Sequence, residues 1–185
     1  MPLVRQSPPA TTPVTPDALA EHLRLPHAAP ETEQTVELTA LIRAATAMIE
    51  RRLDTALVAQ DWLWRTSSPA RSLPLSPVIA ITSVEVVASG GIRTPLANWS
   101  LVRDRPRPRL AVTVHPPVPR NGHVEVLFTA GYGPTADDVP DDIRHAVTLL
   151  AAHFYENREA TTEGRDPLPL GVASLLAPYR PIRIS

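Results

Sequence analysis

The sequence of 185 residues lacks cysteine and lysine entirely. Without cysteine the chain can form no disulfide, thiolate metal site or iron–sulfur cluster, and it has no thiol nucleophile. Its 18 basic residues are all arginine and nearly balance 19 acidic residues, so the net charge is −1. Such a charge gives no overall attraction to nucleic acid or to an anionic membrane, so any contact with DNA must be local.

Long apolar runs are missing as well. No stretch approaches the roughly 18 consecutive apolar residues of a membrane-spanning helix, and the N-terminal sequence MPLVRQSPPATTPVTP has no apolar centre of a signal peptide. We therefore expect a soluble protein made in the cytoplasm, with no membrane partner. The hydrophobic fraction of 43% and the charged fraction of 20% are typical of a globular protein.

Three segments show the spacing or the capping residues of helices. Thr-Pro-Asp at residues 15–17 begins a short helix, 16–25, that ends before Pro26. Residues 31–53 contain no glycine or proline and carry apolar residues at helical spacing. A third helix, 140–159, begins at Pro140 and has acidic residues in its first turn.

Between the second and third helices the apolar residues follow the pattern of strands. Such runs lie at residues 57–66, 83–87, 99–102, 110–114 and 123–129. No helix separates them, so they predict an antiparallel sheet. The expected fold class is α+β: a small helical bundle, with two long helices plus short N- and C-terminal helices, and an inserted antiparallel β-sheet.

The chain is expected to form one domain, residues 15–160, with the β insertion at 57–129. Residues 1–14 are rich in Pro, Ser and Thr and are predicted to form a flexible N-terminal arm. Residues 161–185 are predicted to contain a linker, a short helix and a C-terminal tail for docking on a partner.

One strand leads into glycines whose spacing, G-x-G-x-x-A, matches that of dinucleotide-binding turns. In those turns the glycines open the helix directly, so that its N-terminus faces the pyrophosphate. Here the helix begins at Pro140, and aspartates crowd the position that a phosphate would occupy. We therefore assign Gly131, Gly133 and Pro140 to a structural turn and expect no cofactor.

No catalytic or metal site emerges from the spacing of titratable residues. Asp141 and His145 lie four residues apart on one helix, and Glu156 lies further along it, but a metal site needs three or four converging ligands. No nucleophile motif is present. We expect no enzymatic activity and no bound metal; a metal-dependent hydrolase built on these three residues stays open as an alternative.

Arginines alternate with other residues in RDRPRPRL, residues 103–110. We name residues 103–109 of this sequence the arginine segment. Its four cations are Arg103, Arg105, Arg107 and Arg109. Prolines favour an extended backbone here, so the guanidinium groups can point the same way, as suits phosphate or a carboxylate-rich partner. The segment is a candidate contact for DNA or a protein partner, and the simpler interpretation is a hairpin end kept soluble by charge. A nucleic-acid-binding module of a packaging or repair system is the alternative function.

Several segments together resemble the head-tail connector, or adaptor, proteins of long-tailed bacteriophages and of gene transfer agents. They are LIRAATAMIERRLDTAL, LPLSPVIAITSVEV, and FTAGYG followed by VPDDIRHAVTLLAAHFYENRE, with LPLGVASLLAPYR closing the chain. The resemblance spans most of the sequence. It implies a non-enzymatic subunit of a dodecameric ring beneath the portal, with double-stranded DNA passing through the centre without sequence-specific binding.

The same resemblance implies partners and a location. One face of the ring meets the portal protein and the other meets a stopper or tail-completion protein. Assembly takes place in the bacterial cytoplasm, and the finished ring lies in the head-tail neck of a virion or phage-like particle. The C-terminal segment contributes to docking on the portal, and its candidate contacts are Leu170, Val172, Leu175, Leu176, Tyr179 and Arg180. The apolar stripe in this short helix is expected to pack into a groove of something larger.

Overall fold

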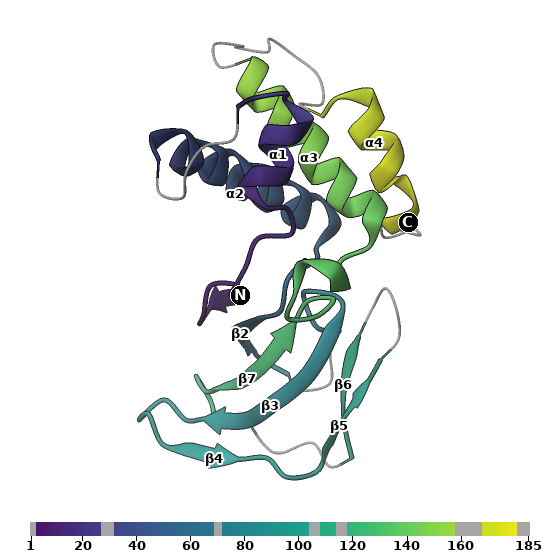
Figure 1. The fold of residues 1–185 in the computed structure, drawn as a ribbon. Coiled ribbons are helices and arrows are strands. Elements are labelled where there is room, and N and C mark those ends of the chain that lie inside the picture. The colour runs from purple at the N-terminus through teal and green to yellow at the C-terminus, as the bar shows by residue number, and fades with distance from the viewer. Residues whose placement is uncertain are drawn as a thin grey trace. The chain divides into compact units, whose positions relative to one another are not determined.

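The computed structural model describes residues 3–26, 32–68, 72–103, 108–113, 118–157 and 168–180. The chain divides into two compact units, each described separately below (Figure 1). The sheet unit comprises Met1–Ala10 and Asp54–Pro134, and the helical unit comprises Thr11–Leu53 and Thr135–Ser185. The predicted fold class is confirmed as α+β: the described residues form four α-helices and an antiparallel sheet.

The sheet unit is built on five antiparallel strands in the order β1-β2-β7-β3-β4. These strands are β1 (Leu3–Arg5), β2 (Gln60–Thr66), β3 (Val78–Val87), β4 (Arg93–Pro95) and β7 (His123–Ala130). Two further strands, β5 (Trp99–Val102) and β6 (Arg109–Val112), pair with each other in a separate two-stranded sheet. The central strand β7 bonds to β2 on one side and to β3 on the other.

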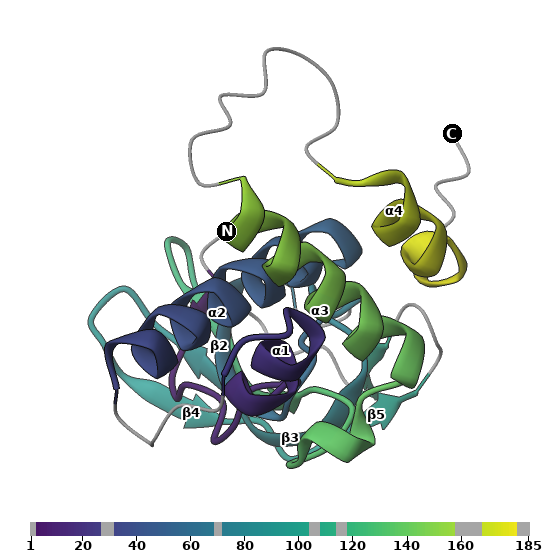
Figure 2. The ribbon, with the colours of Figure 1, turned by 45° about the horizontal axis from the view of Figure 1, so that its top comes forward.

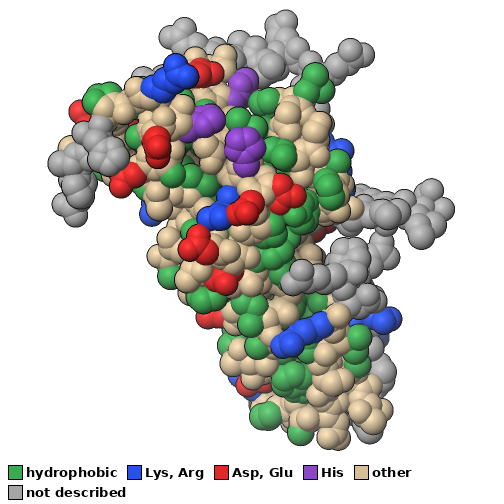
Figure 3. Space-filling model, turned by 45° about the vertical axis from the view of Figure 1, so that its right-hand side comes forward, with side chains coloured by type: hydrophobic (Ala, Val, Ile, Leu, Met, Phe, Trp, Pro, Cys, Tyr) green, Lys and Arg blue, Asp and Glu red, His purple; other side chains and the backbone are tan. Residues whose placement is uncertain are grey.

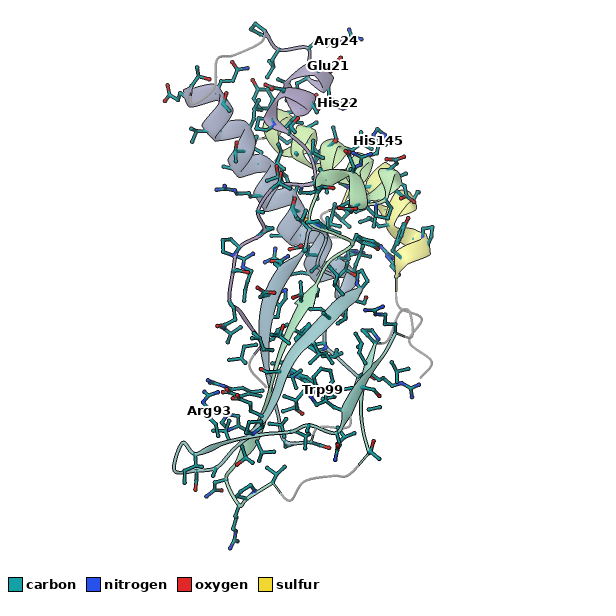
Figure 4. All side chains as sticks on the ribbon, turned by 60° about the horizontal axis from the view of Figure 1, so that its bottom comes forward. Glu21, His22, Arg24, Arg93, Trp99 and His145 are labelled. Atoms are coloured by element: carbon teal, nitrogen blue, oxygen red, sulfur yellow. The ribbon has the colours of Figure 1, made fainter. Side chains whose placement is uncertain are left out.

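Alternation of side chains across the pleat produces the core of the sheet unit. Val124, Val126, Phe128 and Ala130 of β7 are fully buried at every second position. Trp64 of β2 joins the same cluster, and Trp99 of β5 packs against it (Figure 4). The period of two in the sequence of β7 therefore directs these four side chains into the core.

Three parts of the sheet unit differ from the predicted elements. Residues 3–5, expected within a flexible arm, form β1, because β2 offers its edge to them: Leu3 pairs with Trp64, and the Gln6 amide donates to the carbonyl of Asp61 at 2.8 Å. β3 begins at Val78, five residues before the predicted start, and β4 was not predicted. β1, the start of β3 and β4 all depend on pairing with other strands. No local sequence pattern predicts such pairing.

The helical unit contains α1 (Pro16–His22), α2 (Glu33–Leu53), α3 (Asp141–Glu156) and α4 (Leu170–Leu176), with short 3-10 helices η1 (Ala136–Asp138) and η2 (Ala177–Tyr179). The Thr15 side chain caps α1 by accepting from the Ala18 amide at 3.2 Å. α1 ends three residues before the predicted position, because Arg24 has a positive φ of 55°. α2 and α3 begin within two residues of their predicted starts.

The core of the helical unit is formed by the apolar stripes of its helices. α1 contacts α2 and α3, and α3 contacts both α2 and α4 (Figure 2). Ile42 and Ile49 of α2 and Ile143 and Leu150 of α3 are fully buried. No helix in the described part of the chain is long and apolar enough to cross a membrane.

Candidate interaction surfaces

The turn after β7 is fixed by backbone hydrogen bonds on both sides. The Gly131 amide donates to the carbonyl of Pro77 at 2.9 Å, and the Tyr132 amide donates to the carbonyl of Leu57 at 3.0 Å. The Gly133 carbonyl accepts from the Ala59 amide at 2.8 Å. Gly131 has a φ of +141°, and a Cβ on it would lie 2.5 Å from the backbone nitrogen of Ala59. The position therefore requires glycine for two independent reasons.

These bonds explain why the glycine spacing does not make a phosphate site. The amides of residues 131 and 132 already have carbonyl partners, so they cannot cradle an anion. Downstream, Thr135 and Asp138 form a capping box around η1, and Pro140 is the N-cap of α3. Gly131 and Gly133 thus take part in a hydrogen-bonded turn, and Pro140 directly precedes the first residue of α3.

The six C-terminal candidates for portal docking lie in very different environments. Val172 and Leu176 are fully buried, and α4, which contains both, packs against α3. Leu170 is 88% exposed, Arg180 is also exposed, and Leu175 and Tyr179 are half-buried. The apolar stripe of α4, expected to pack on something larger, packs within the same chain. Val172 and Leu176 are therefore core residues, and the other four candidates are exposed or half-buried.

A hydrogen bond from η2 adds to this attachment. The Tyr179 hydroxyl lies 2.7 Å and 2.9 Å from the two carboxylate oxygens of Asp142, in the first turn of α3. Because the bond is made to a charged group, it is stronger than one between neutral partners. Tyr179 therefore holds the chain after α4 against the start of α3.

Only two members of the arginine segment lie among the described residues. Arg103 is exposed and donates from a guanidinium nitrogen to the carbonyl of Ile79 at 2.7 Å. Arg109 is exposed at the start of β6, where it pairs in register with Val102 of β5. Arg105 and Arg107 lie outside the described residues. Arg103 thus directly follows Val102 of β5, Arg109 is the residue of β6 paired with Val102, and the role of the segment stays a prediction.

An open groove in the helical unit lies between residues 13–15, α1, η1 and α3 and has a volume of about 360 Å³. We name it the acidic groove. Its apolar lining includes Val14, Ala18 and Ala136, and its rim carries Asp137 and Asp141. Both carboxylates are about nine-tenths exposed and bond to Arg144, Asp137 at 2.9 Å. Figure 3 shows acidic side chains gathered around a basic one on this face of the helical unit.

A buried carboxylate that sequence reasoning missed lies in the sheet unit. Glu125 of β7 is 3% exposed and accepts hydrogen bonds from Arg65 at 2.8 Å and from Arg93 at 2.6 Å. His123 lies 3.2 Å away, and Arg93 also bonds to Glu85. Burial alone would raise the pKa of Glu125, but the bonds from Arg65, His123 and Arg93 lower it below its ordinary value.

The position of Glu125 explains why this network forms. Glu125 lies opposite Arg65 in β2 and opposite Glu85 in β3. Arg65 therefore reaches the carboxylate from the neighbouring strand, and Arg93 reaches it from β4, beyond β3. The network ties β2, β7, β3 and β4 together near one end of the sheet. A strand pattern with two acidic residues and two arginines on separate strands is the only signal for it, and the register is needed to read that signal.

No group of three or more histidine or acidic side chains within the described ranges is placed to hold a metal ion. His22 projects from the end of α1 and His145 from α3 (Figure 4). Asp141 points its carboxylate to Arg144, with which it forms an ion pair. The three residues of the hydrolase alternative, Asp141, His145 and Glu156, are therefore not brought together as metal ligands.

Comparison with known proteins identifies the family. The model of the head completion protein family matches residues 20–166. The chain belongs to the head completion protein family. This agrees with the resemblance to head-tail connectors found in the sequence. No curated protein matches the chain.

Solved structures of gene transfer agent (GTA) particles contain chains similar to this head completion protein. A chain in the neck of an empty particle, computed with C6 symmetry, has a TM-score of 0.86 and 31% identity, and the match covers 100% of this chain and 98% of the other. A chain in the virion of the native particle gives 0.84 and 32%, with the same coverage. A chain in the native neck, computed with C12 symmetry, gives 0.79 and 30%, again with 100% and 98% covered.

The structural matches extend over more of this head completion protein than the family model does. The family model ends at residue 166, before α4 begins at Leu170. The GTA chains match over the full length. The candidate docking residues of α4 and η2 therefore lie outside the family model but within the structural likeness.

Proposed function

We propose that this head completion protein is a structural subunit of the head-tail neck of a phage-like particle, acting as a connector between the portal and the tail. The observation that carries the proposal is the likeness over the whole chain, at 31% identity and a TM-score of 0.86, to a chain in the neck of a GTA particle. The protein works by its shape and its contacts, without catalysis. It assembles in the bacterial cytoplasm and ends in the neck of the particle.

The subunit acts as a closed homo-oligomeric ring of twelve copies. Support comes from the similar chains, which belong to necks computed with C6 and C12 symmetry. A ring of identical subunits needs head-to-tail contacts, so each copy must present two different and complementary surfaces. Double-stranded DNA passes through the centre, and a net charge of −1 does not hold its phosphates strongly.

The portal contacts are made by the exposed residues of α4 and η2. Leu170 is a large apolar side chain that is 88% exposed, and Arg180 lies nearby in sequence with its side chain also exposed. Val172 and Leu176 fix the helix on α3, so the exposed residues are presented on a supported helix rather than on a free tail. The opposite surface receives the stopper or tail-completion protein.

The test uses particles produced in cells that lack the chain. We expect heads without attached tails, and we expect the wild-type chain to restore complete necks in electron micrographs. Leu170→Asp combined with Arg180→Glu should fold but should fail to join the portal. Val36→Asp, an equally drastic change at a residue of α2 that is 63% exposed, is the control and should restore necks. Complete necks without the chain would contradict the proposed function, whereas restoration by the double variant would contradict only the portal contact.

A further inference from the structure

The two units carry opposite charge, although the whole chain is nearly neutral. The sheet unit contains nine arginines and five acidic residues, which gives +4. The helical unit contains nine arginines and 14 acidic residues, which gives −5, and the two values together account for the net −1 of the chain. Identical copies of such a molecule attract each other when the sheet unit of one approaches the helical unit of another.

Each unit has a place where charged side chains lie beside apolar surface. In the sheet unit, Arg103 donates a hydrogen bond to the carbonyl of Ile79. Ile79 and Val102, the residue before Arg103, are apolar side chains that stay partly exposed, at 36% and 38%. Arg109 lies opposite Val102 in the hairpin. The end of the β5–β6 hairpin therefore offers cations and apolar side chains together, a combination suited to a protein partner.

The acidic groove offers the complement. Its lining is partly apolar, through Val14, Ala18 and Ala136, and its rim holds the carboxylates of Asp137 and Asp141. Arg144 forms ion pairs with both carboxylates. Asp138 lies between them in sequence and is bonded to Thr135 rather than to a cation. Two negative charges on the rim therefore share one positive charge, and the excess is negative. An arginine from outside gains bonds to carboxylate oxygens while its aliphatic stem covers the apolar lining.

We propose that neighbouring copies in the ring contact each other through these two surfaces, with Arg103 and Arg109 at the hairpin end of one copy docked at the acidic groove of the next. The proposal rests on the proposed function, because it names the partner surfaces of that ring. The two surfaces differ and are complementary, so the contact is head-to-tail and can repeat until a ring closes. It also gives Arg103 and Arg109 a protein partner in place of DNA phosphate.

Charge reversal provides the test, read by native mass spectrometry and electron microscopy of the assembled chain, alone and with portal. Asp137→Arg with Asp141→Arg reverses the groove, and Arg103→Glu with Arg109→Glu reverses the hairpin. Each variant alone should form at least tenfold fewer rings than wild type. Controls make the same changes of charge at exposed sites elsewhere in the same units: Glu33→Arg with Glu156→Arg, and Arg5→Glu with Arg120→Glu. Both controls should assemble as wild type does.

Mixing the two reversed variants is the decisive measurement. Each contact in an alternating ring then joins opposite charges, so rings should return with equal shares of the two variants and an even number of copies. A mixture that fails to assemble, or reversed variants that assemble alone, would overturn the proposed contact. Neither result would contradict the proposed ring itself. The hairpin variant could also form normal rings in particles that retain or release DNA abnormally. That result would overturn the contact and show that these arginines bind DNA phosphate instead. A wild-type chain that forms no ring under any condition would overturn the contact together with the proposed function.

Discussion

The sheet unit and the helical unit are held together by different means. In the sheet unit, strands far apart in sequence meet at the central strand β7, a glycine turn locks against a neighbouring backbone, and one buried carboxylate joins three strands. In the helical unit, amphipathic helices pack through side chains alone, and α4 adds two buried residues to α3. The sheet unit is therefore sensitive to backbone geometry and to charge, whereas the helical unit is sensitive to side-chain volume.

The sheet unit and the helical unit also differ in net charge. A net charge of −1 suggests a surface with no strong field, yet the units carry +4 and −5. A nearly neutral total thus conceals two units of opposite charge, as suits a subunit that binds copies of itself.

The largest effect should come from the glycine turn of the sheet unit. Gly131→Val places a β-branched side chain at a φ of +141°, with its Cβ about 2.5 Å from the Ala59 backbone. We expect the free energy of unfolding to fall by about 4 kcal/mol or more, because backbone strain and overlap add together. Urea unfolding followed by circular dichroism measures the change.

Gly90→Ala is the matched control in the same unit. No atom lies within 4 Å of a Cβ on Gly90, and we expect a change within about 0.5 kcal/mol. Equal losses for the two variants would mean that the turn at Gly131 is not a special feature of the sheet unit.

The next effect should come from the side-chain packing of the helical unit. Leu176→Ala removes a fully buried side chain from the contact between α4 and α3, and we expect a loss of about 3 kcal/mol. Leu170→Ala, on the same helix but 88% exposed, should change stability by less than about 0.5 kcal/mol. Hydrogen exchange of α4, combined with urea unfolding, separates local detachment from global unfolding. A similar loss from both variants would show that α4 is not attached through its buried face.

A smaller effect should come from the charge network of the sheet unit. Glu125→Gln keeps the shape of the side chain but removes the charge that Arg65 and Arg93 share, and both arginines are about half exposed and can be hydrated again. We therefore expect a loss of about 2 kcal/mol at neutral pH. Glu85→Gln, which alters only the outer bond to Arg93, is the control and should cost less.

The pH dependence of this loss has a definite sign. The pKa of Glu125 is lowered in the folded chain, so its contribution is present above the ordinary carboxyl pKa and disappears as the pH falls through the lowered value. The stability difference between wild type and Glu125→Gln should therefore shrink from about pH 5 downward. A difference that grows on acidification would contradict the assigned direction.

The helices could be predicted because their signals are local. Thr15 as an N-cap and the apolar stripe that includes Ile42 and Ile49 need only neighbouring residues, and the structure places α1 and α2 accordingly. The candidate docking residues could not be sorted in this way. A stripe containing Val172 and Leu176 looks the same whether it packs on a partner or on the chain itself, and only the structure assigns these two to its own core.

The same limit applies to the sheet unit. Nothing near Glu125 in sequence distinguishes it from any polar residue of an alternating strand, because its cations come from residues 60 positions before it and 32 positions before it. β1 escaped prediction for a similar reason, since its three residues become a strand only against the edge of β2.

The sequence by itself determined the α+β class, the main helices, the need for glycine after β7 and the likeness to neck connectors, because each depends on local spacing or on a preserved order of segments. The tertiary structure alone decided which apolar residues of α4 are buried and that Glu125 lies among arginines. It also decided that Asp137 and Asp141 lie at the rim of the acidic groove. These features arise from pairs of residues that are distant along the chain, and their meeting depends on strand register and helix packing, which no single segment encodes.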